Sequence, residues 1–168
     1  MTKRNVMIQI ATKRVKIMES LFDEMADNDG DDFYDDGDEP ETMELWTEGR
    51  LITSPTRVEL VYDEGESSGM QGSVTSIGFD RIHPSLVSMV RSGLVSTAMV
   101  FEREKRHFSL YDTPFSSFQI CVRALTVDNR LLTDGELTLD YQIEVQGAQA
   151  EKCLMTLKIH NDQSIFPE

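Results

Sequence analysis

The sequence predicts an all-β protein, a sandwich or barrel of short antiparallel strands. Three observations predict it. In Glu136–Val145 apolar and polar residues alternate strictly, and the segment Cys153–Ile159 repeats the alternation. Successive side chains of a strand point to opposite faces, so each segment is expected to form a strand with one buried face. The third observation is a series of turn signals at short intervals, which is typical of sandwiches and barrels.

The first part of the chain predicts a strand, a helix and a loop. Asn5–Thr12 alternates in the same way and is expected to form the first strand. Apolar residues at helical spacing in Ile17–Met25 predict a short amphipathic helix. Ala26–Pro40 is rich in Asp and Gly and has too few apolar residues to offset the entropy of ordering, so we expect a mobile loop.

From Thr42 onward the chain predicts nine more strands separated by turn residues such as Ser92-Gly93 and Asp134-Gly135. The predicted strands are Thr42–Thr53, Thr56–Asp63, Gly72–Asp80, Ser85–Arg91, Leu94–Glu102, Arg106–Tyr111, Ser117–Val127, Gly135–Val145 and Gln149–His160. Leu94–Glu102 is apolar on both faces. Either a second element covers its outer face, or that face meets a second subunit.

The length and charge of the chain limit the number of domains and the kinds of partner that we expect. The chain has 168 residues, enough for one domain with a real core, and a formal net charge of −14. Thirteen of its 30 acidic residues lie in Glu19–Glu44, so the rest is close to neutral. Such acidity excludes nucleic acid as an expected partner, because binding it needs a cationic surface.

Localisation is expected to be cytoplasmic, without membrane association. No apolar segment is long enough to cross a bilayer, and no signal peptide is evident. The two cysteines, Cys121 and Cys153, fall on opposite parities of their strands relative to the apolar residues. They are therefore expected to be free thiols on different sides of the sheet.

The order of several short motifs resembles a known family. The motifs are Tyr62-Asp63-Glu64, Ser68-Gly69-Met70, Thr75, Met89-Val90-Arg91-Ser92-Gly93, Met99-Val100-Phe101, Tyr111-Asp112-Thr113-Pro114, Asp134-Gly135-Glu136-Leu137 and Tyr141. Their spacing over about two thirds of the chain is similar to the YwiB-like family of uncharacterised bacterial proteins, a domain of unknown function. The resemblance implies a calycin-like, lipocalin-like antiparallel β-barrel of about eight to ten strands. It implies no activity, catalytic residue or ligand.

The chain departs from the family pattern in one segment. Residues 17–41 form an acidic insertion after the first strand, within a single domain of residues 1–168. An EF-hand loop needs oxygen ligands at fixed positions around a glycine, and neither Gly30 nor Gly37 supplies that pattern. The three histidines form no cluster at ligand spacing, so no metal or other cofactor is expected. No nucleophile motif or phosphate loop is present, and we expect no enzymatic activity.

Arg91 is the strongest candidate for a ligand-binding residue. Its parity is that of Val87 and Met89, so it faces the interior if that face lines the barrel. A buried charge needs a partner, which could be a ligand carboxylate, an internal Glu or a Tyr hydroxyl. The alternative is an arginine at a strand end that reaches solvent. Further candidates for lining the same cavity are Tyr62, Tyr111, Tyr141, Met89 and Met99, all of which could equally be core residues.

Two functional hypotheses follow. In the first, the protein is a non-catalytic binding protein that holds a small, partly apolar and perhaps anionic ligand in the barrel, with Arg91 binding the anionic group. In the second, the barrel is filled by side chains, and the protein binds a basic protein or a second copy through its acidic segment and an apolar strand face. The two hypotheses differ in whether the barrel interior is hollow or filled. The sequence does not decide between them, because Met and Leu fill cores and line pockets equally well.

Overall fold

The computed structural model describes residues 1–16, 40–65, 71–145 and 148–161. In these ranges the chain forms ten strands and no helix. The strands are β1 (Thr2–Lys16), β2 (Glu41–Thr53), β3 (Arg57–Asp63), β4 (Val74–Asp80), β5 (Leu86–Ser92), β6 (Ser96–Glu102), β7 (Arg106–Asp112), β8 (Ser117–Arg130), β9 (Glu136–Val145) and β10 (Ala148–Asn161). All ten predicted strands are confirmed, and β1 is longer than Asn5–Thr12 at both ends. The predicted helix and almost all of the acidic insertion lie outside the described residues.

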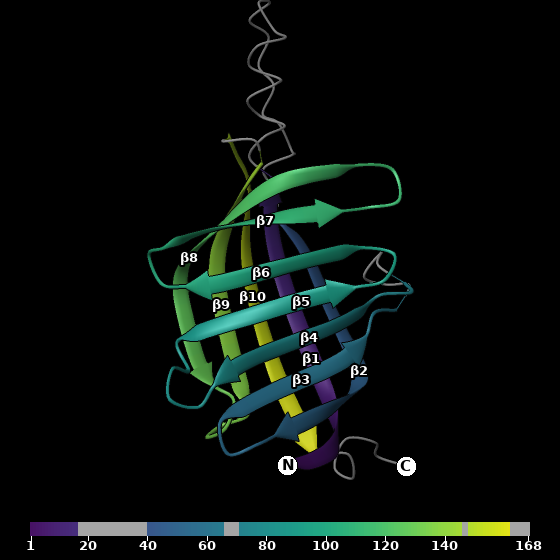
Figure 1. The fold of residues 1–168 in the computed structure, drawn as a ribbon, viewed down its shortest axis with the longest axis vertical. Helices are drawn as coiled ribbons and strands as arrows, with labels where there is room; N and C mark the ends of the chain where they lie inside the picture. Colours follow the sequence, from purple (N-terminus) through teal and green to yellow (C-terminus); the bar gives the residue numbers. More distant parts are fainter. Residues whose placement is uncertain (17–39, 66–70, 146–147, 162–168) are drawn as a thin grey trace, which may run out of the picture.

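The strands close into an antiparallel barrel in which sequence neighbours lie side by side and β1 joins β10 to β2. Figure 1 shows the short strands β3–β7 crossing in front of the long strands β1, β9 and β10. Closure gives every strand a neighbour on both sides and so limits the free sheet edges that favour aggregation. No helix in the described ranges has the length and hydropathy of a membrane span.

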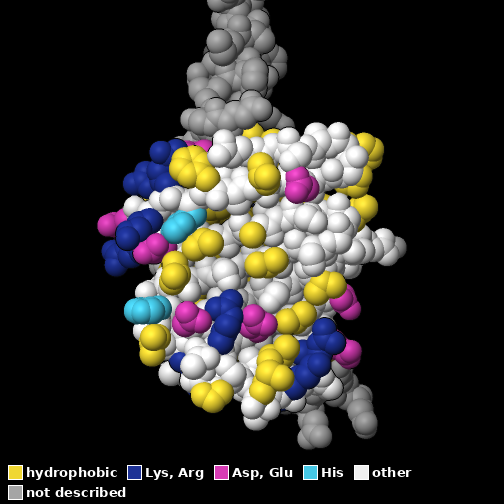
Figure 2. Space-filling view, viewed as in Figure 1, with side chains coloured by type: hydrophobic (Ala, Val, Ile, Leu, Met, Phe, Trp, Pro, Cys, Tyr) yellow, Lys and Arg dark blue, Asp and Glu magenta, His cyan; other side chains and the backbone are white. Residues whose placement is uncertain are grey.

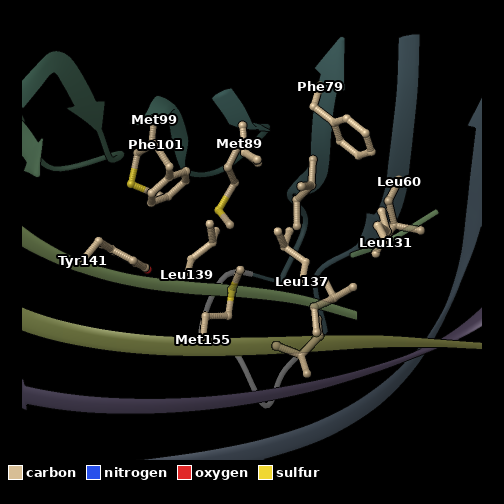
Figure 3. Packing of buried hydrophobic residues seen from close by; sticks show 14 of the residues in the cluster. Leu60, Phe79, Met89, Met99, Phe101, Leu131, Leu137, Leu139, Tyr141 and Met155 are labelled. Atoms are coloured by element: carbon tan, nitrogen blue, oxygen red, sulfur yellow. The ribbon is translucent and has the colours of Figure 1, made fainter. Parts of the chain in front are cut away.

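Alternation decides which side chains enter the barrel. Val6, Ile8 and Ile10 of β1 are buried, as are Leu137 and Leu139 of β9. Figure 3 shows Leu137, Leu139 and Tyr141 of β9 pointing across the interior towards side chains from the strands opposite. Full burial of one such aliphatic side chain stabilises the fold by about 1.5–3 kcal/mol. The interior is therefore a continuous apolar core along much of its length.

The backbone geometry of the turn between β5 and β6 requires a glycine at position 93. Gly93 lies between β5 and β6 with a φ of 128°, a conformation that residues with a side chain rarely adopt. A Cβ there would also collide with the carbonyl oxygen of Gly72. The predicted turn at Ser92-Gly93 thus depends on glycine for both conformation and space.

The apolar residues on both faces of the middle strands divide between core and surface. Val95, Met99 and Phe101 are buried, whereas Leu94 is 55% exposed and Val90 is 45% exposed. Figure 2 shows apolar side chains distributed over this outer face of the barrel, between charged groups. The described part of the chain does not cover that face.

Candidate functional site

The polar side chains of the interior gather near one end of the barrel. Arg91 of β5 pairs in register with Thr75 of β4 and Thr97 of β6. The same row continues to Tyr62 on β3 and Tyr111 on β7. Side chains directly opposite each other on antiparallel strands lie about 5 Å apart at Cβ, so five polar residues line one band of the inner wall.

Within this band Arg91 belongs to a buried polar network. Its Nη2 lies 3.5 Å from Glu64 Oε1, and the two side chains are only 10% and 5% exposed. Its Nε donates to Thr75 Oγ1 at 3.1 Å, and the Thr75 hydroxyl donates to Glu64 Oε1 at 2.6 Å. Of the partners considered for a buried Arg91, an internal Glu and a Tyr hydroxyl are both present, and the alternative of an arginine in solvent is wrong.

Glu64 corrects a second interpretation. At the end of a predicted strand, the adjacent acids Asp63 and Glu64 look like a solvated edge. Asp63 is exposed, but Glu64 is buried because the ladder continues past the end of β3 through a hydrogen bond from its N–H to Ser73 O at 2.8 Å. A signal in the sequence could have identified Glu64. Every second residue of this strand points inward, namely Val58, Leu60 and Tyr62, and Glu64 is the next residue in that series.

Tyr62 completes the network. Burial raises the pKa of its hydroxyl well above the usual range, and the nearby Glu64 charge adds to that rise. The Arg91 charge and hydrogen bonds with the Thr75 and Arg91 side chains oppose the rise only in part. Tyr62 is therefore a neutral hydroxyl beside the buried ion pair.

A second polar group faces the interior from β1 and β10. Arg14 pairs in register with Cys153, which in turn pairs with Tyr141 on β9. Burial raises the pKa of the Cys153 thiol to about 11, helped by the Glu151 charge. Burial also raises the pKa of Tyr141 beyond the usual range. Both groups are neutral at physiological pH, so the charge of this group comes from Arg14 and the neighbouring acids.

Arg14 is a residue that the sequence analysis missed, because the predicted first strand ended at Thr12. In the structure β1 continues to Lys16, and Arg14 keeps the inward parity of Ile10 and Thr12. It is half-buried, and its Nε has no hydrogen-bond partner among the described residues.

The remaining candidate lining residues also face inward. Met89 and Met99 are buried and pair in register, and Met89 Sδ lies 3.7 Å from Arg91 Nη2. Tyr141 is buried against Phe101, with ring centroids 4.8 Å apart. Tyr111 is partly buried and stacks on Phe118. The six candidate residues thus share the interior, with polar atoms beside methionine and aromatic surface.

The two cysteines form no disulfide with each other. Cys121 and Cys153 are both free, as predicted, and lie on opposite sides of the wall. Cys153 faces inward, whereas Cys121 lies near Arg106 and Glu144. No group of three or more His, Cys, Asp or Glu side chains in the described ranges is arranged to hold a metal ion.

Comparison with known proteins shows a family match and a similar solved structure. Residues 31–157 match the model of a family described as a domain of unknown function, DUF1934. The chain belongs to this family. The crystal structure of the ywiB protein from Bacillus subtilis is similar, with a TM-score of 0.61 and 14% sequence identity over 95% of this chain and 94% of that chain.

These findings confirm the resemblance to the YwiB-like family. At 14% identity, the structural likeness shows a shared fold. No curated protein matches the chain by sequence.

Proposed function

We propose that this protein is a non-catalytic binding protein that takes a small, partly apolar anion into the polar end of its barrel. The observation that carries the proposal is a buried arginine, Arg91, set among hydroxyl groups and methionine side chains in an otherwise apolar interior. Antiparallel barrels of this size either hold one small ligand or are filled by side chains, and lipocalin-like proteins are a main class of the first kind.

The chemistry of the network supports an anionic ligand. A guanidinium group has five N–H donors, and the contacts of Arg91 with Thr75, Glu64, Met89 and Tyr62 do not occupy all of them among the described residues. Thr75 and Glu64 fix the orientation of the group before any ligand arrives, which lowers the entropic cost of binding. Met89 and Met99 next to it offer adaptable apolar surface for the body of the ligand.

The cost of the buried pair supports the same conclusion. Replacing a buried ion pair with apolar residues of similar volume is often neutral or stabilising, so such a pair is weak evidence for a role in stability. A role in recognition accounts for its presence in the core.

We also propose that the barrel is related to the calycins. We propose further that the protein is cytoplasmic, which its two free thiols support.

Titration calorimetry with octanoate, a small amphipathic anion, tests the proposal. Wild type should bind about one equivalent. The double variant Arg91→Met/Glu64→Gln should bind at least about tenfold more weakly, because it loses charge-assisted hydrogen bonds. The double variant is needed because Arg91→Met alone leaves Glu64 buried without a counter-ion, at a cost of about 3–5 kcal/mol in stability.

The matched control makes the same substitutions on the outside of the barrel, in Arg57→Met/Glu59→Gln. These side chains form an exposed ion pair at 3.1 Å, so their removal should leave octanoate affinity unchanged. Equal affinity of wild type and the interior variant would show that the Arg91 network does not bind the anion.

A second candidate function is protein–protein interaction, and a specific observation favours it. Phe108 and Leu110 on β7 are 62% and 59% exposed, and Val90 on β5 and Leu94 in the β5–β6 turn are exposed as well. A monomer seldom leaves a large contiguous apolar patch in water. Association of two chains in sedimentation analysis would support this alternative, whereas a monomer at all concentrations would leave the ligand-binding proposal as the better account.

A further inference from the structure

The wall of the barrel has an incomplete seam between β6 and β7, two strands that the structure describes in full. Their registered pairing consists of Ser96↔Asp112 and Thr97↔Tyr111. If this register continued, Ala98 would face Leu110, but beyond Thr97 the two strands are not paired. The backbone groups that β6 and β7 direct towards each other along the seam are therefore not joined in a ladder.

The seam is bounded at both ends. At one end lie the two registered pairs. At the other end the β6–β7 turn is attached to β8, because the Glu104 N–H donates to Ala124 O at 2.8 Å. On their other sides β6 pairs continuously with β5, and β7 pairs continuously with β8. The seam can therefore widen in its middle while both strands stay attached to the rest of the barrel.

The inner side of the seam leads to the Arg91 network. Met99 of β6 faces inward and is only 5% exposed, so its side chain covers the inner wall beside the seam. Met99 pairs in register with Met89, whose Sδ lies 3.7 Å from Arg91 Nη2. A methionine side chain is unbranched and adaptable, so this cover can rearrange at low cost.

Side-chain hydroxyls do not bridge the seam in place of the backbone. Thr97 Oγ1 on β6 and Ser109 Oγ on β7 are both buried and have no hydrogen-bond partner in the part of the chain that the structure describes. Most buried hydroxyl groups in folded proteins are hydrogen-bonded. The contact between β6 and β7 is therefore weak in its side chains as well as in its backbone.

The outer side of the seam is apolar. Phe108 and Leu110 of β7 point away from the interior, and more than half of each side chain is exposed. Ala98 and Val100 of β6 share this outer face. Apolar side chains outside and methionines inside thus flank the same stretch of wall, which offers an amphipathic molecule apolar contacts on both sides of it.

On the basis of the proposed binding function, we infer that the ligand enters and leaves the barrel through the seam between β6 and β7. Phe108 and Leu110 are the first surface that its apolar body contacts. Met99 is the side chain that moves to admit it. The anionic group then reaches Arg91 on β5, the strand next to β6.

A disulfide across the seam tests this route. Ala98→Cys/Leu110→Cys places two thiols just beyond the last registered pair, where ordinary strand spacing brings the Cα atoms within the range of a disulfide. The background carries Cys121→Ala, because Cys121 lies in register with Phe108. The probe is octanoate fluorinated at its terminal carbon, whose affinity and exchange rates are both followed by fluorine NMR.

Oxidation of this double variant should slow association and dissociation together by at least about tenfold. The affinity should stay unchanged, because the bound state is not altered, and reduction should restore both rates. The matched control, Ser76→Cys/Val90→Cys, places a disulfide across a registered pair of β4 and β5. Its oxidation should change neither rate.

Charge on the outer surface gives a second test that does not need a disulfide to form. Phe108→Glu repels and Phe108→Lys attracts octanoate at the entrance, so both exchange rates should be at least about threefold lower in the first variant, at equal affinity. The same pair of substitutions at Leu154, an exposed residue of β10, should give equal rates.

Each failure has a different signature. Equal exchange rates in the oxidised and reduced seam variant, or in the two Phe108 variants, overturn this route while the barrel remains a ligand-binding protein. A loss of affinity without slower exchange also overturns it, because residues of a route are not part of the bound state. If wild type does not bind octanoate, the proposed function fails, and the inference that rests on it fails as well.

Discussion

At the residue scale, the central feature is a buried arginine whose partners come from two neighbouring strands. Glu64 follows β3 and Thr75 begins β4, and both contact the guanidinium group of Arg91 on β5. A charge in a core is tolerated when it is paired and its hydrogen bonds are satisfied. Arg91 meets that condition largely within the protein, whereas Arg14 Nε has no hydrogen-bond partner in the part of the chain that the structure describes.

The buried thiol of Cys153 predicts a loss of stability at alkaline pH. Burial raises its pKa from the ordinary thiol value of 9.0 to about 11, so the folded state binds this proton more tightly. The stabilisation is complete below about pH 9 and is lost as pH rises towards 11. Two pKa units correspond to about 3 kcal/mol. The urea midpoint should therefore fall steeply between pH 9 and pH 11.

Tyr62 and Tyr141 act in the same direction at still higher pH, because burial raises the pKa of both. Cys153→Ala isolates the thiol, and its urea midpoint should fall less than that of wild type between pH 9 and 10. Parallel pH profiles for the two proteins would contradict the burial of a protonated thiol at this position.

What the sequence predicts at this scale depends on where a residue lies in its strand. Parity correctly placed Met89, Met99 and Tyr141 inside, because apolar neighbours on both sides mark their face. It was not applied to Glu64 and Arg14, because both lie beyond the predicted ends of their strands. A charged residue there has the same local pattern whether it faces solvent or a polar interior. Only the register with neighbouring strands distinguishes the two cases, and register is not a local property.

At the element scale, the hairpin of β6 and β7 is the weak point of the wall. β5 and β6 form six registered pairs and β7 and β8 form seven, but β6 and β7 form only Ser96↔Asp112 and Thr97↔Tyr111. The two strands therefore lack registered pairing along Ala98–Phe101 and His107–Leu110. Unpaired backbone groups there are the natural place for the barrel to open.

Hydrogen exchange tests this weakness. Alternate amides of Ala98–Phe101 and His107–Leu110, those directed towards the other strand, should exchange much faster than the amides of β9, which has paired neighbours on both sides. The measurement is native-state exchange followed by NMR. Protection of β6 and β7 as uniform as that of β9 would contradict an opening between them.

The ends of the strands also depend on residues far away in the sequence. The predicted first strand ended at Thr12, where basic residues begin, yet β1 runs to Lys16. Pairing with β2 extends to Arg14, and pairing with β10 extends to Lys16. Charged residues have low strand propensity, but backbone hydrogen bonds to neighbouring strands stabilise the strand here. Strand propensity is a local property and does not include these hydrogen bonds.

At the scale of the whole molecule, the strands were predictable and the closure was not. Alternation and turn residues predicted ten strands, and they left sandwich and barrel equally open. The barrel was implied by the family resemblance, and the structure confirms a closed ring in which β1 joins β10 to β2. The pairing that closes the ring is between residues far apart in the sequence, such as Ile8 and Ile159.

The interior polar groups of the closed ring lie towards one end. A continuous apolar core fills much of the barrel, and the polar rows of Arg91 and Arg14 lie towards the end where β1 finishes. An occupant with an apolar body and one acidic group matches both surfaces. This match between a charged band and an apolar interior is the central claim.

Native mass spectrometry of the full chain, purified without added ligand and then incubated with octanoate, tests that claim most directly. The account predicts a constant extra mass, carried by a compound with one acidic group or by octanoate, that is lost when the protein is denatured. A bare chain mass before and after incubation, with the barrel folded, would contradict it.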